Sequence, residues 1–410
     1  MANTIRTNDI VIEAGRLLKN KSIFLRNSVM GYDERFGKNG AKQGDTASIR
    51  LPARYTVQDG PVYQDQAHNE TIAQIVINKR KNLGVKFTAE ELKLSMDMFS
   101  KRVIAPAMNQ LAAEVDSIIA RDIYKQIGQS TGTPGTTPAS VQVLLDTNAK
   151  MNNMGVPGSP RSLVLNPAGE AGVVGGMSTL FNGQDIIEKQ MKTGMVGSNI
   201  LGFDSISSSP NIPMHTNGSR TAGTTSAAVT TQGTTSIALT GLGASGTIKE
   251  GDVFTIADCY AVNPLTRQST GQLYQFVAAA DVTAGGGAGA ATVTIRHALY
   301  SADAVSNDDV QLAIVNTLPG NSKTTTFVGT ASVVYPQNLA FWKDAIAVAF
   351  VDVSLPGNGV TTATYSDPDT GLTIAYTQGD DIKNFESIKR FDVFFGSKLI
   401  RPEGAVRLWG

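Results

Sequence analysis

The alternation of apolar and polar residues changes several times along this chain, and each change predicts a different element. Residues 7–30 repeat apolar positions at helical spacing, and Thr7 or Asn8 can cap the first turn. The apolar positions are Ile10, Ala14, Leu17, Leu18, Phe24 and Leu25. We therefore expect the chain to begin with an amphipathic helix.

The next pattern is the strict alternation that is typical of strands. Residues 46–57 place apolar side chains on one face and polar ones on the other, and Pro52 favours a position at a sheet edge. A second long strand is predicted from about Thr71 to Phe87, after a polar turn. Because an isolated two-stranded hairpin is barely stable in water, we expect this one to lie on another surface, such as a second copy of the chain.

The strongest helix signal covers residues 88–127. Thr88 and Glu91 have the spacing of a capping box, and Gly128 is placed to end the helix. Apolar residues recur between them at three- and four-residue steps. A helix of this length would span roughly 60 Å, and Pro106 inside it predicts a kink. Such a rod suits an elongated protein better than a compact one.

The second half of the chain predicts shorter elements. A helix is expected at 139–154, and "RSLVLNP" (161–167) reads as a short buried strand. Near residue 217 the composition shifts toward Thr, Gly, Ala and Ser, with short alternating runs such as "SIALT" and "DVFTIA" separated by turns. Because the earlier character returns from residue 322, we interpret 217–321 as a small β-barrel or sandwich inserted into a larger α+β domain.

Composition narrows the possible functions. A chain of 410 residues predicts two or three domains, and only 17% of its residues are charged. A surface with few charges is often covered by neighbouring subunits. The 35 basic and 35 acidic residues cancel, which argues against a protein that grips nucleic acid through a basic surface. The first residues lack the apolar core of a signal peptide, so we expect a soluble protein made in a reducing cytoplasm.

One motif suggests a cofactor. Gly241, Gly243 and Gly246 have the spacing of a dinucleotide-binding loop, which requires a strand before it and a helix directly after it. The residues that follow, "TIKEGDVFTI", predict another strand with a turn at Gly251. We therefore interpret these four glycines as structural turns of the inserted β domain, and we predict no cofactor.

Other candidate sites are weak. "GYDERFGK" (31–38) departs from a phosphate-binding loop in its spacing, and "DPDTGL" (367–372) departs from a calcium loop and is better explained as a turn between strands. The three histidines have no partner at the spacing of zinc ligands. The single cysteine, Cys259, is expected to be a small buried residue of a strand. We find no catalytic or metal site and expect no enzyme.

The densest basic run is Lys79-Arg80-Lys81, in the predicted hairpin. One interpretation is a solvated flank of a strand, and another is contact with an acidic patch on a neighbouring subunit. Contact with nucleic acid is a further alternative. With Arg50 and Arg54 on the polar face of the first strand, these five residues are our candidates for contacts between subunits.

Several stretches, taken in order, resemble the tailed-phage major capsid proteins with the Hong Kong ninety-seven fold. "RSLVLNP" is similar to that family's buried axial strand, and "VGSNILGFDSISSSPNIPMHT" (196–216) is similar to the segment before an insertion. Residues 248–278, 335–356 and 381–410 resemble the inserted domain, return strands and C-terminus of the P-twenty-two-type podophage coat proteins. The resemblance covers most of the chain.

This resemblance implies a division of the chain into parts. These are an N-terminal arm (1–40), an extended hairpin (41–87), a spine helix of a peripheral domain (88–130), an axial domain (131–216), an inserted β-barrel (217–321) and a return to both domains (322–410). It also implies assembly of hexamers and pentamers with a scaffolding protein and a portal in the host cytoplasm, and a shell around double-stranded DNA. A decoration protein is a further possible partner, and no membrane is expected.

Other functions stay open at this stage. A bacterial nanocompartment shell shares the fold, although the inserted domain argues against it. A secreted Thr/Gly-rich adhesin would need a signal peptide, and a nucleotide-dependent oxidoreductase would need a helix after Gly246. The near-neutral charge also suits a container whose DNA must slide past its wall rather than adhere to it.

Overall fold

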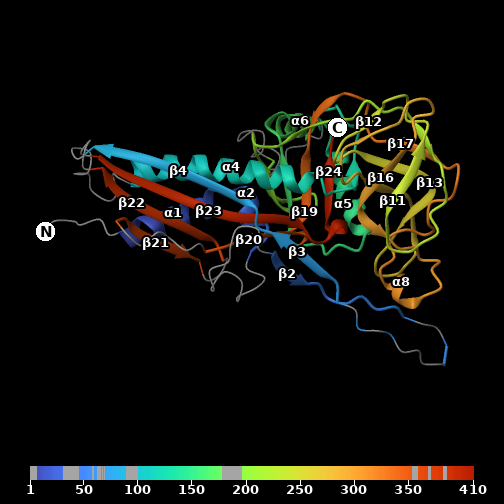
Figure 1. Ribbon diagram of the computed structural model, residues 1–410, viewed down its shortest axis with the longest axis horizontal. Helices are drawn as coiled ribbons and strands as arrows, with labels where there is room; N and C mark the ends of the chain where they lie inside the picture. The colour runs from blue at the N-terminus through green and yellow to red at the C-terminus, as the bar shows by residue number, and fades with distance from the viewer. Residues whose placement is uncertain are drawn as a thin grey trace. The chain divides into compact units, whose positions relative to one another are not determined.

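The computed structural model describes residues 7–30, 46–57, 60–61, 66, 68, 70–88, 100–177, 196–352, 359–367, 371–381 and 386–410. Helices and strands mix along the chain, as an α+β protein requires (Figure 1). Two compact units form. The first comprises Met1–Arg50, Ile72–Ala120 and Ile346–Ile400, and the second comprises Leu51–Thr71, Arg121–Ala345 and Arg401–Gly410.

The first unit is built on a six-stranded sheet with the order β1-β20-β23-β22-β21, to which β4 adds through β23. The strands are β1 (Val29–Met30), β4 (Lys79–Thr88), β20 (Ile346–Phe350), β21 (Thr361–Ser366), β22 (Thr373–Asp381) and β23 (Glu386–Leu399). The long strand β23 holds the sheet together, because β4 pairs along one side of it and β22 and β20 pair along the other (Figure 1). Its buried aromatic residues Phe391 and Phe395 supply much of the core.

The N-terminal helix is interrupted where one continuous helix was predicted. Helix α1 (Thr7–Lys21) packs against β21 and β22, and α2 (Ile23–Asn27) begins immediately after Ser22. The break at Ser22 has a local cause, since its backbone is extended and its hydroxyl caps α2 by accepting from the N–H of Leu25. Gly15 allows the close approach to β21, because a Cβ at this position would overlap the ring of Tyr365.

The predicted hairpin is shorter than expected and lies on its own chain. Among the described residues, strand β2 (Thr46–Arg50) pairs with β3 (Ile72–Val76) alone, and β4 continues from this pair to join β23. The first strand ends before Pro52, which cannot donate to a ladder. The inner face of the hairpin is buried, and Gly396 of β23 lies so close that a Cβ there would overlap the Val76 carbonyl. The buried residues are Ala47, Ile49, Ala73 and Ile75.

The predicted spine helix is described in its C-terminal part. Thr88 ends strand β4, where it pairs with Glu386, and the predicted capping box with Glu91 extends into residues outside the described part. Residues 89–99 lie outside the described part. A π-helix (Ser100–Ile104) then leads into α4 (Ala105–Tyr124), a rod of roughly 30 Å. Pro106 lies just after the junction between the π-helix and α4, so this residue, which has no N–H to donate, coincides with a local change in helix geometry.

The second unit contains a six-stranded sheet in the order β5-β24-β19-β6-β8-β7. Its strands are β5 (Ser130–Thr131), β6 (Arg161–Leu165), β7 (Ser198–Ile200), β8 (Phe203–Ser208), β19 (Asn338–Trp342) and β24 (Ala405–Leu408). The predicted buried strand at 161–165 is confirmed, since all five of its residues are buried. The predicted helix at 139–154 is α5 (Val141–Asn153), capped by Ser140, and α6 (Pro167–Met177) follows β6.

A second six-stranded sheet lies in the same unit, with the order β14-β13-β17-β10-β11-β16. It comprises β10 (Gly223–Thr225), β11 (Thr234–Thr240), β13 (Val253–Val262), β14 (Ser269–Val277), β16 (Ala291–Leu299) and β17 (Thr324–Phe327). A bridge between Ala278 and Ile295 connects its two outer strands. The short pair β12 (Thr247–Ile248) with β15 (Val282–Thr283) lies within the same stretch of sequence, and the pair β9 (Met214–Thr216) with β18 (Val334–Pro336) flanks that stretch. Helix α8 (Asn307–Gln311) precedes β17.

Candidate functional site

The five candidate contact residues do not gather in one place. Arg50 ends strand β2, where it is exposed and pairs in register with Ile72. Arg54 belongs to the second unit, and its Nη2 lies 2.6 Å from Oε1 of Glu403. This ion pair fixes the start of the connection that follows the hairpin strand. Glu403 could not be predicted as the partner of Arg54, because the two residues are far apart along the chain.

The three basic residues of β4 face partners in their own unit. Arg80 approaches Oδ1 of Asp392 at 3.2 Å and stacks over the ring of Phe394. The Lys81 Nζ lies 2.7 Å from Oε1 of Glu114 in α4, while Lys79 is paired through its backbone with Phe395. The pair of Lys81 with Glu114 is exposed and contributes little stability to the isolated chain, whereas Asp392 in the pair with Arg80 is buried.

The glycine motif forms turns. Gly241, Gly243 and Gly251 have φ angles of 81°, 87° and 96°, a region that residues with a side chain rarely adopt. Gly246 donates its N–H to Gly243 O at 3.0 Å, and a Cβ there would overlap the Leu242 carbonyl. Strand β12 follows directly, so no helix N-terminus is present to hold a pyrophosphate, and the interpretation as a dinucleotide-binding loop is excluded.

The predicted calcium-loop-like segment at 367–372 is a turn, and Cys259 is a buried residue of a strand. Asp367 and Gly371 close the connection between β21 and β22, with Gly371 N donating to Asp367 O at 2.7 Å, so the turn interpretation is confirmed. "GYDERFGK" lies outside the described residues. Cys259 is buried in β13, and burial raises the pKa of its thiol to about 12, so it does not act as a nucleophile at neutral pH.

A buried polar cluster, which the sequence did not reveal, joins four segments of the second unit. The Tyr124 hydroxyl lies 3.3 Å from Nδ1 of His215, and Nε2 of His215 lies 2.9 Å from Oδ1 of Asp252. A hydroxyl, an imidazole and a carboxylate in a row resemble an acid–base relay. All three are buried, however, with exposed fractions of 4%, 3% and 0%, so the row presents no reacting group to solvent.

Two buried guanidinium groups complete this cluster. Arg220 lies 3.5 Å from Oδ2 of Asp252, and Arg407 of β24 donates to Gly251 O at 2.9 Å while its guanidinium faces the ring of Tyr124. Burial lowers the pKa of Arg407 to about 10. The cluster therefore fixes the turn before β13 against β24 and α4, and its role is structural.

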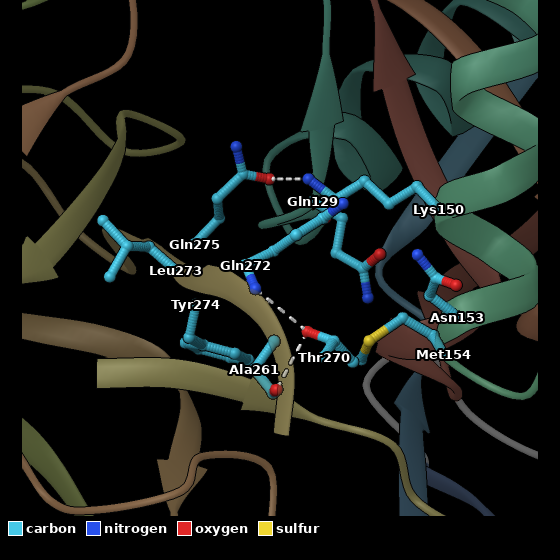
Figure 2. Close-up of a pocket in the computed structure, with 10 residues that line it drawn as sticks. All are labelled: Gln129, Lys150, Asn153, Met154, Ala261, Thr270, Gln272, Leu273, Tyr274 and Gln275. Carbon is cyan, nitrogen blue, oxygen red and sulfur yellow. Dashed lines mark hydrogen bonds between the residues drawn. The ribbon is translucent and has the colours of Figure 1, made fainter. Parts of the chain in front are cut away.

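A second group of polar residues lines a small cavity of about 10 Å³, which is large enough for one water molecule (Figure 2). The Nζ of Lys150 donates to Ser130 O at 2.8 Å and to Oε1 of Gln275 at 2.6 Å. The same Gln275 oxygen accepts from the N–H of Ser130. Burial lowers the pKa of Lys150 to about 8, since no carboxylate lies among the residues that line this cavity.

The histidines and acidic residues do not form a metal site in the part of the chain that the structure describes. His68 contacts the Tyr55 hydroxyl at 2.6 Å, and His297 lies 3.0 Å from Gln126 O. Across the same residues, no helix combines the length and the apolar character that crossing a bilayer requires.

Comparison with known proteins gives one clear match. The family model described as "P22 coat protein - gene protein 5" matches residues 37–410. No curated protein matches the chain significantly.

Solved phage structures resemble the chain more distantly. A structure from Mycobacterium phage Che8 has 13% identity and a TM-score of 0.41, with 94% of this chain and 90% of that chain covered. The asymmetric unit of the bacteriophage PhiM1 mature capsid has 13% identity and a TM-score of 0.41, over 94% and 86%. The capsid of Ralstonia phage GP4 has 11% identity and a TM-score of 0.38, over 95% and 92%. Because these superpositions are loose, the assignment rests on the sequence family, whose match spans nearly the whole chain: the protein belongs to the P22 coat protein family and is a major capsid protein that forms a phage shell.

Proposed function

We propose that this chain builds an icosahedral shell, first as a procapsid and then as a mature head, around the double-stranded DNA of a tailed phage. The observation that carries the proposal is the family match over residues 37–410. Membership of that family makes the chain a structural subunit of a phage shell, which contains many copies. We further propose that the shell is icosahedral, that it matures from a procapsid and that it encloses DNA.

The hairpin supplies the surface that we propose for contacts between copies. Its inner face is buried on its own sheet, while Ile72 and Val76 of the outer face are 59% and 48% exposed. Strand β2 has β3 as its only strand partner in the described chain, which leaves its other edge open to pairing. Burial of the outer face and this edge by a neighbouring copy would gain modest energy, multiplied by the number of copies.

We also propose that the five basic residues contribute to these contacts by exchanging partners. The side chains of Arg54, Arg80 and Lys81 are 33%, 45% and 36% exposed in their ion pairs. The pair of Lys81 with Glu114 is exposed on both sides, and such a pair is worth about 0–1 kcal/mol, so a neighbour's carboxylate can compete for Lys81 at little cost. Asp392 is buried but also pairs with Arg390, which would remain its partner if Arg80 turned to a neighbour. Arg50 and Lys79 lie on the same hairpin and the adjoining strand.

Further parts of the proposal concern partners and organisation. We propose assembly in the host bacterial cytoplasm with a scaffolding protein and a portal, nonspecific contact with packaged DNA, and a surface that can accept a decoration protein. Residues 217–321 would act as an inserted β domain, with the four turn glycines fixing its connections. No cofactor and no catalytic step belong to this function.

Deletion of residues 58–70 tests the proposal. We expect the variant to remain a folded, soluble monomer by circular dichroism and gel filtration, and to form no closed shells when expressed with its neighbouring genes. Arg16→Ala, which removes an exposed ion pair within α1, is the control and should still form shells. Normal shells from the deletion variant would show that this loop is not a contact between copies, and wild-type shells that contain a cargo protein and no DNA would indicate a nanocompartment instead.

A further inference from the structure

The residues that follow strand β2 belong to the second unit, where polar contacts hold them in place. Arg54 forms its ion pair with Glu403, which lies in a short 3-10 helix (Pro402–Gly404) directly before β24. Gln66 accepts from the N–H of Thr56 at 2.9 Å, and Nε2 of the buried Gln311 donates to the same Gln66 oxygen at 3.3 Å. We call the two contacts of Arg54 with Glu403 and of Gln66 with Gln311 the internal latch.

A second arginine opposes this latch. Burial lowers the pKa of Arg267, and the nearby positive charge of Arg54 lowers it further. Within the described residues, Nε and Nη1 of Arg267 have neither an acceptor nor contact with solvent. Buried donors without an acceptor, placed beside a like charge, raise the free energy of the state that contains them. The internal latch therefore joins a favourable ion pair to an unfavourable neighbour.

Hydrogen bonds prevent Arg267 from turning away. Its N–H donates to Asn263 O at 2.9 Å, and its Nη2 donates to Gln311 O at 2.7 Å. Its φ of 59° also lies in the left-handed region that residues with a side chain rarely adopt. The turn between β13 and β14 thus fixes the guanidinium where it repels Arg54, and the repulsion lasts as long as the latch is closed.

The latched residues expose their other side to solvent. Tyr55 and Val57 alternate with Arg54 and Thr56 along the chain, and they are 57% and 99% exposed. The Tyr55 ring stacks on His68, and its hydroxyl lies 2.6 Å from Nδ1 of that histidine. Because a shell of this family contains many copies, a neighbouring copy can contact this outer side while the latch is still closed.

We propose that the internal latch restrains this segment in the unassembled chain and opens when a second copy binds the segment. The inference rests on the proposed function, in which the hairpin and its connection contact neighbouring copies. On opening, Arg54 exchanges Glu403 for a carboxylate of the neighbour, and its repulsion with Arg267 ends. While the latch is closed, fewer chains are competent to assemble, so shells form more slowly than the contact between copies alone would allow.

Two substitutions should move the latch in opposite directions. E403Q removes the carboxylate that holds Arg54, so hydrogen exchange at residues 51–57 and the rate of shell formation should each rise about two- to fivefold. R267Q removes the repulsion and keeps an N–H donor, so both rates should fall. Mass spectrometry of the full-length, unassembled chain measures the exchange, and light scattering under conditions in which the wild type forms shells measures the assembly.

The ion pair of Glu13 with Arg16 in α1 supplies matched controls. E13Q and R16Q make the same two chemical changes at an exposed pair of the first unit, and each should leave both rates at the wild-type value. A structure of the assembled shell should show Arg54 separated from Glu403 of its own chain. A pair that persists within each chain of the shell would overturn the proposal.

Four kinetic results would also overturn it. Slower shell formation by E403Q would show that the contact positions the segment for its neighbour and does not restrain it. Unchanged or faster exchange in R267Q would show that Arg267 does not oppose the latch. Equal changes in the control variants would show a response to net charge alone. If exchange changes as expected but every variant forms shells at the wild-type rate, the latch does not control assembly, and the deletion of residues 58–70 still tests the proposed function separately.

Discussion

The Nε2 atom of His215 lies 2.9 Å from Oδ1 of Asp252, and both side chains are buried. The second carboxylate oxygen of Asp252 accepts hydrogen bonds from the N–H groups of Gly218 and Lys249 at 3.1 and 3.0 Å. One carboxylate therefore holds strand β9, the segment after it and the turn before β13 in a single arrangement. Because it has no exposure, water cannot replace any of these bonds.

Asp252→Asn should destabilise the chain strongly. An amide offers one acceptor oxygen where the carboxylate offers two, so either His215 or the two backbone donors lose their acceptor in a buried site. Loss of a buried, charge-assisted network of this kind costs about 2–4 kcal/mol. Urea unfolding of the unassembled chain, followed by circular dichroism, measures the change in the free energy of unfolding.

Asp258→Asn is the matched control for this variant. Asp258 forms its ion pair with Lys323 in solvent, where the two side chains are 65% and 40% exposed. Its φ of 66° is also one that Asn tolerates. We expect a loss below about 1 kcal/mol. If both variants lost the same free energy of unfolding, the buried network around Asp252 would contribute no more to stability than the exposed ion pair of Asp258.

Because Lys150 is buried, we expect the free energy of unfolding to increase with pH. Burial lowers the folded-state pKa of Lys150 to about 8 from its ordinary value of 10.5. The unfolded chain therefore binds more protons between these values, and stability increases as pH rises through this window. Relative to Lys150→Met, which cannot titrate, the wild type should gain up to about 3 kcal/mol between pH 8 and pH 10.5. A difference that stays constant across this range would contradict the burial of a charged amine.

Because Asp116 is buried, we expect the free energy of unfolding to decrease as pH rises through the acid range. Its carboxylate accepts from the Ser22 hydroxyl and from the N–H groups of Ile23 and Phe24, at the start of α2. Burial is the largest influence and raises its pKa from 3.8 to about 6. The folded chain therefore binds the proton more tightly than the unfolded chain does, and the stabilisation present below pH 3.8 is lost as pH rises to 6.

Asp116→Asn isolates this effect, because the amide keeps an acceptor and does not titrate. We expect the wild type to lose up to about 3 kcal/mol relative to the variant between pH 4 and pH 6. Urea unfolding at several pH values gives the two curves. If the wild type instead became less stable relative to the variant as pH falls from 6 to 4, the folded state would favour the Asp116 carboxylate, and a raised pKa for Asp116 would be wrong.

Local sequence patterns correctly predicted strands and helices whose formation depends mainly on residues close together in the sequence. The strands at 234–240, 253–262, 269–277 and 291–299 follow alternating runs bounded by turn residues. Helix α5 (Val141–Asn153) lies within the range predicted for a helix, 139–154, and Ser140 caps its start. The family resemblance came from the order of such stretches, and the family match confirms it.

Long-range partners could not be predicted in this way. Thr88 was predicted from its capping pattern alone, and its place at the end of the ladder with β23, opposite Glu386, was not. The basic run of β4 gave no indication of Asp392, which lies 312 residues away. The buried pair of His215 and Asp252 is separated by 37 residues in segments without a shared motif. Tertiary contacts decided each of these cases, and a single sequence does not record them.

The turn glycines give a last prediction, on the motif that suggested a cofactor. Alanine at Gly241 and Gly243 would have to adopt φ angles of 81° and 87°, which costs about 1–2 kcal/mol at each position. The matched control is Gly286→Ala, since its φ is outside this region and a Cβ there meets no atom within 4 Å. We expect G241A/G243A to unfold at lower urea concentration than wild type and G286A to unfold with it. Calorimetry with a dinucleotide should show no heat of binding for the wild type. A normal unfolding curve for the double variant, or tight dinucleotide binding by the wild type, would contradict a purely conformational role for these glycines.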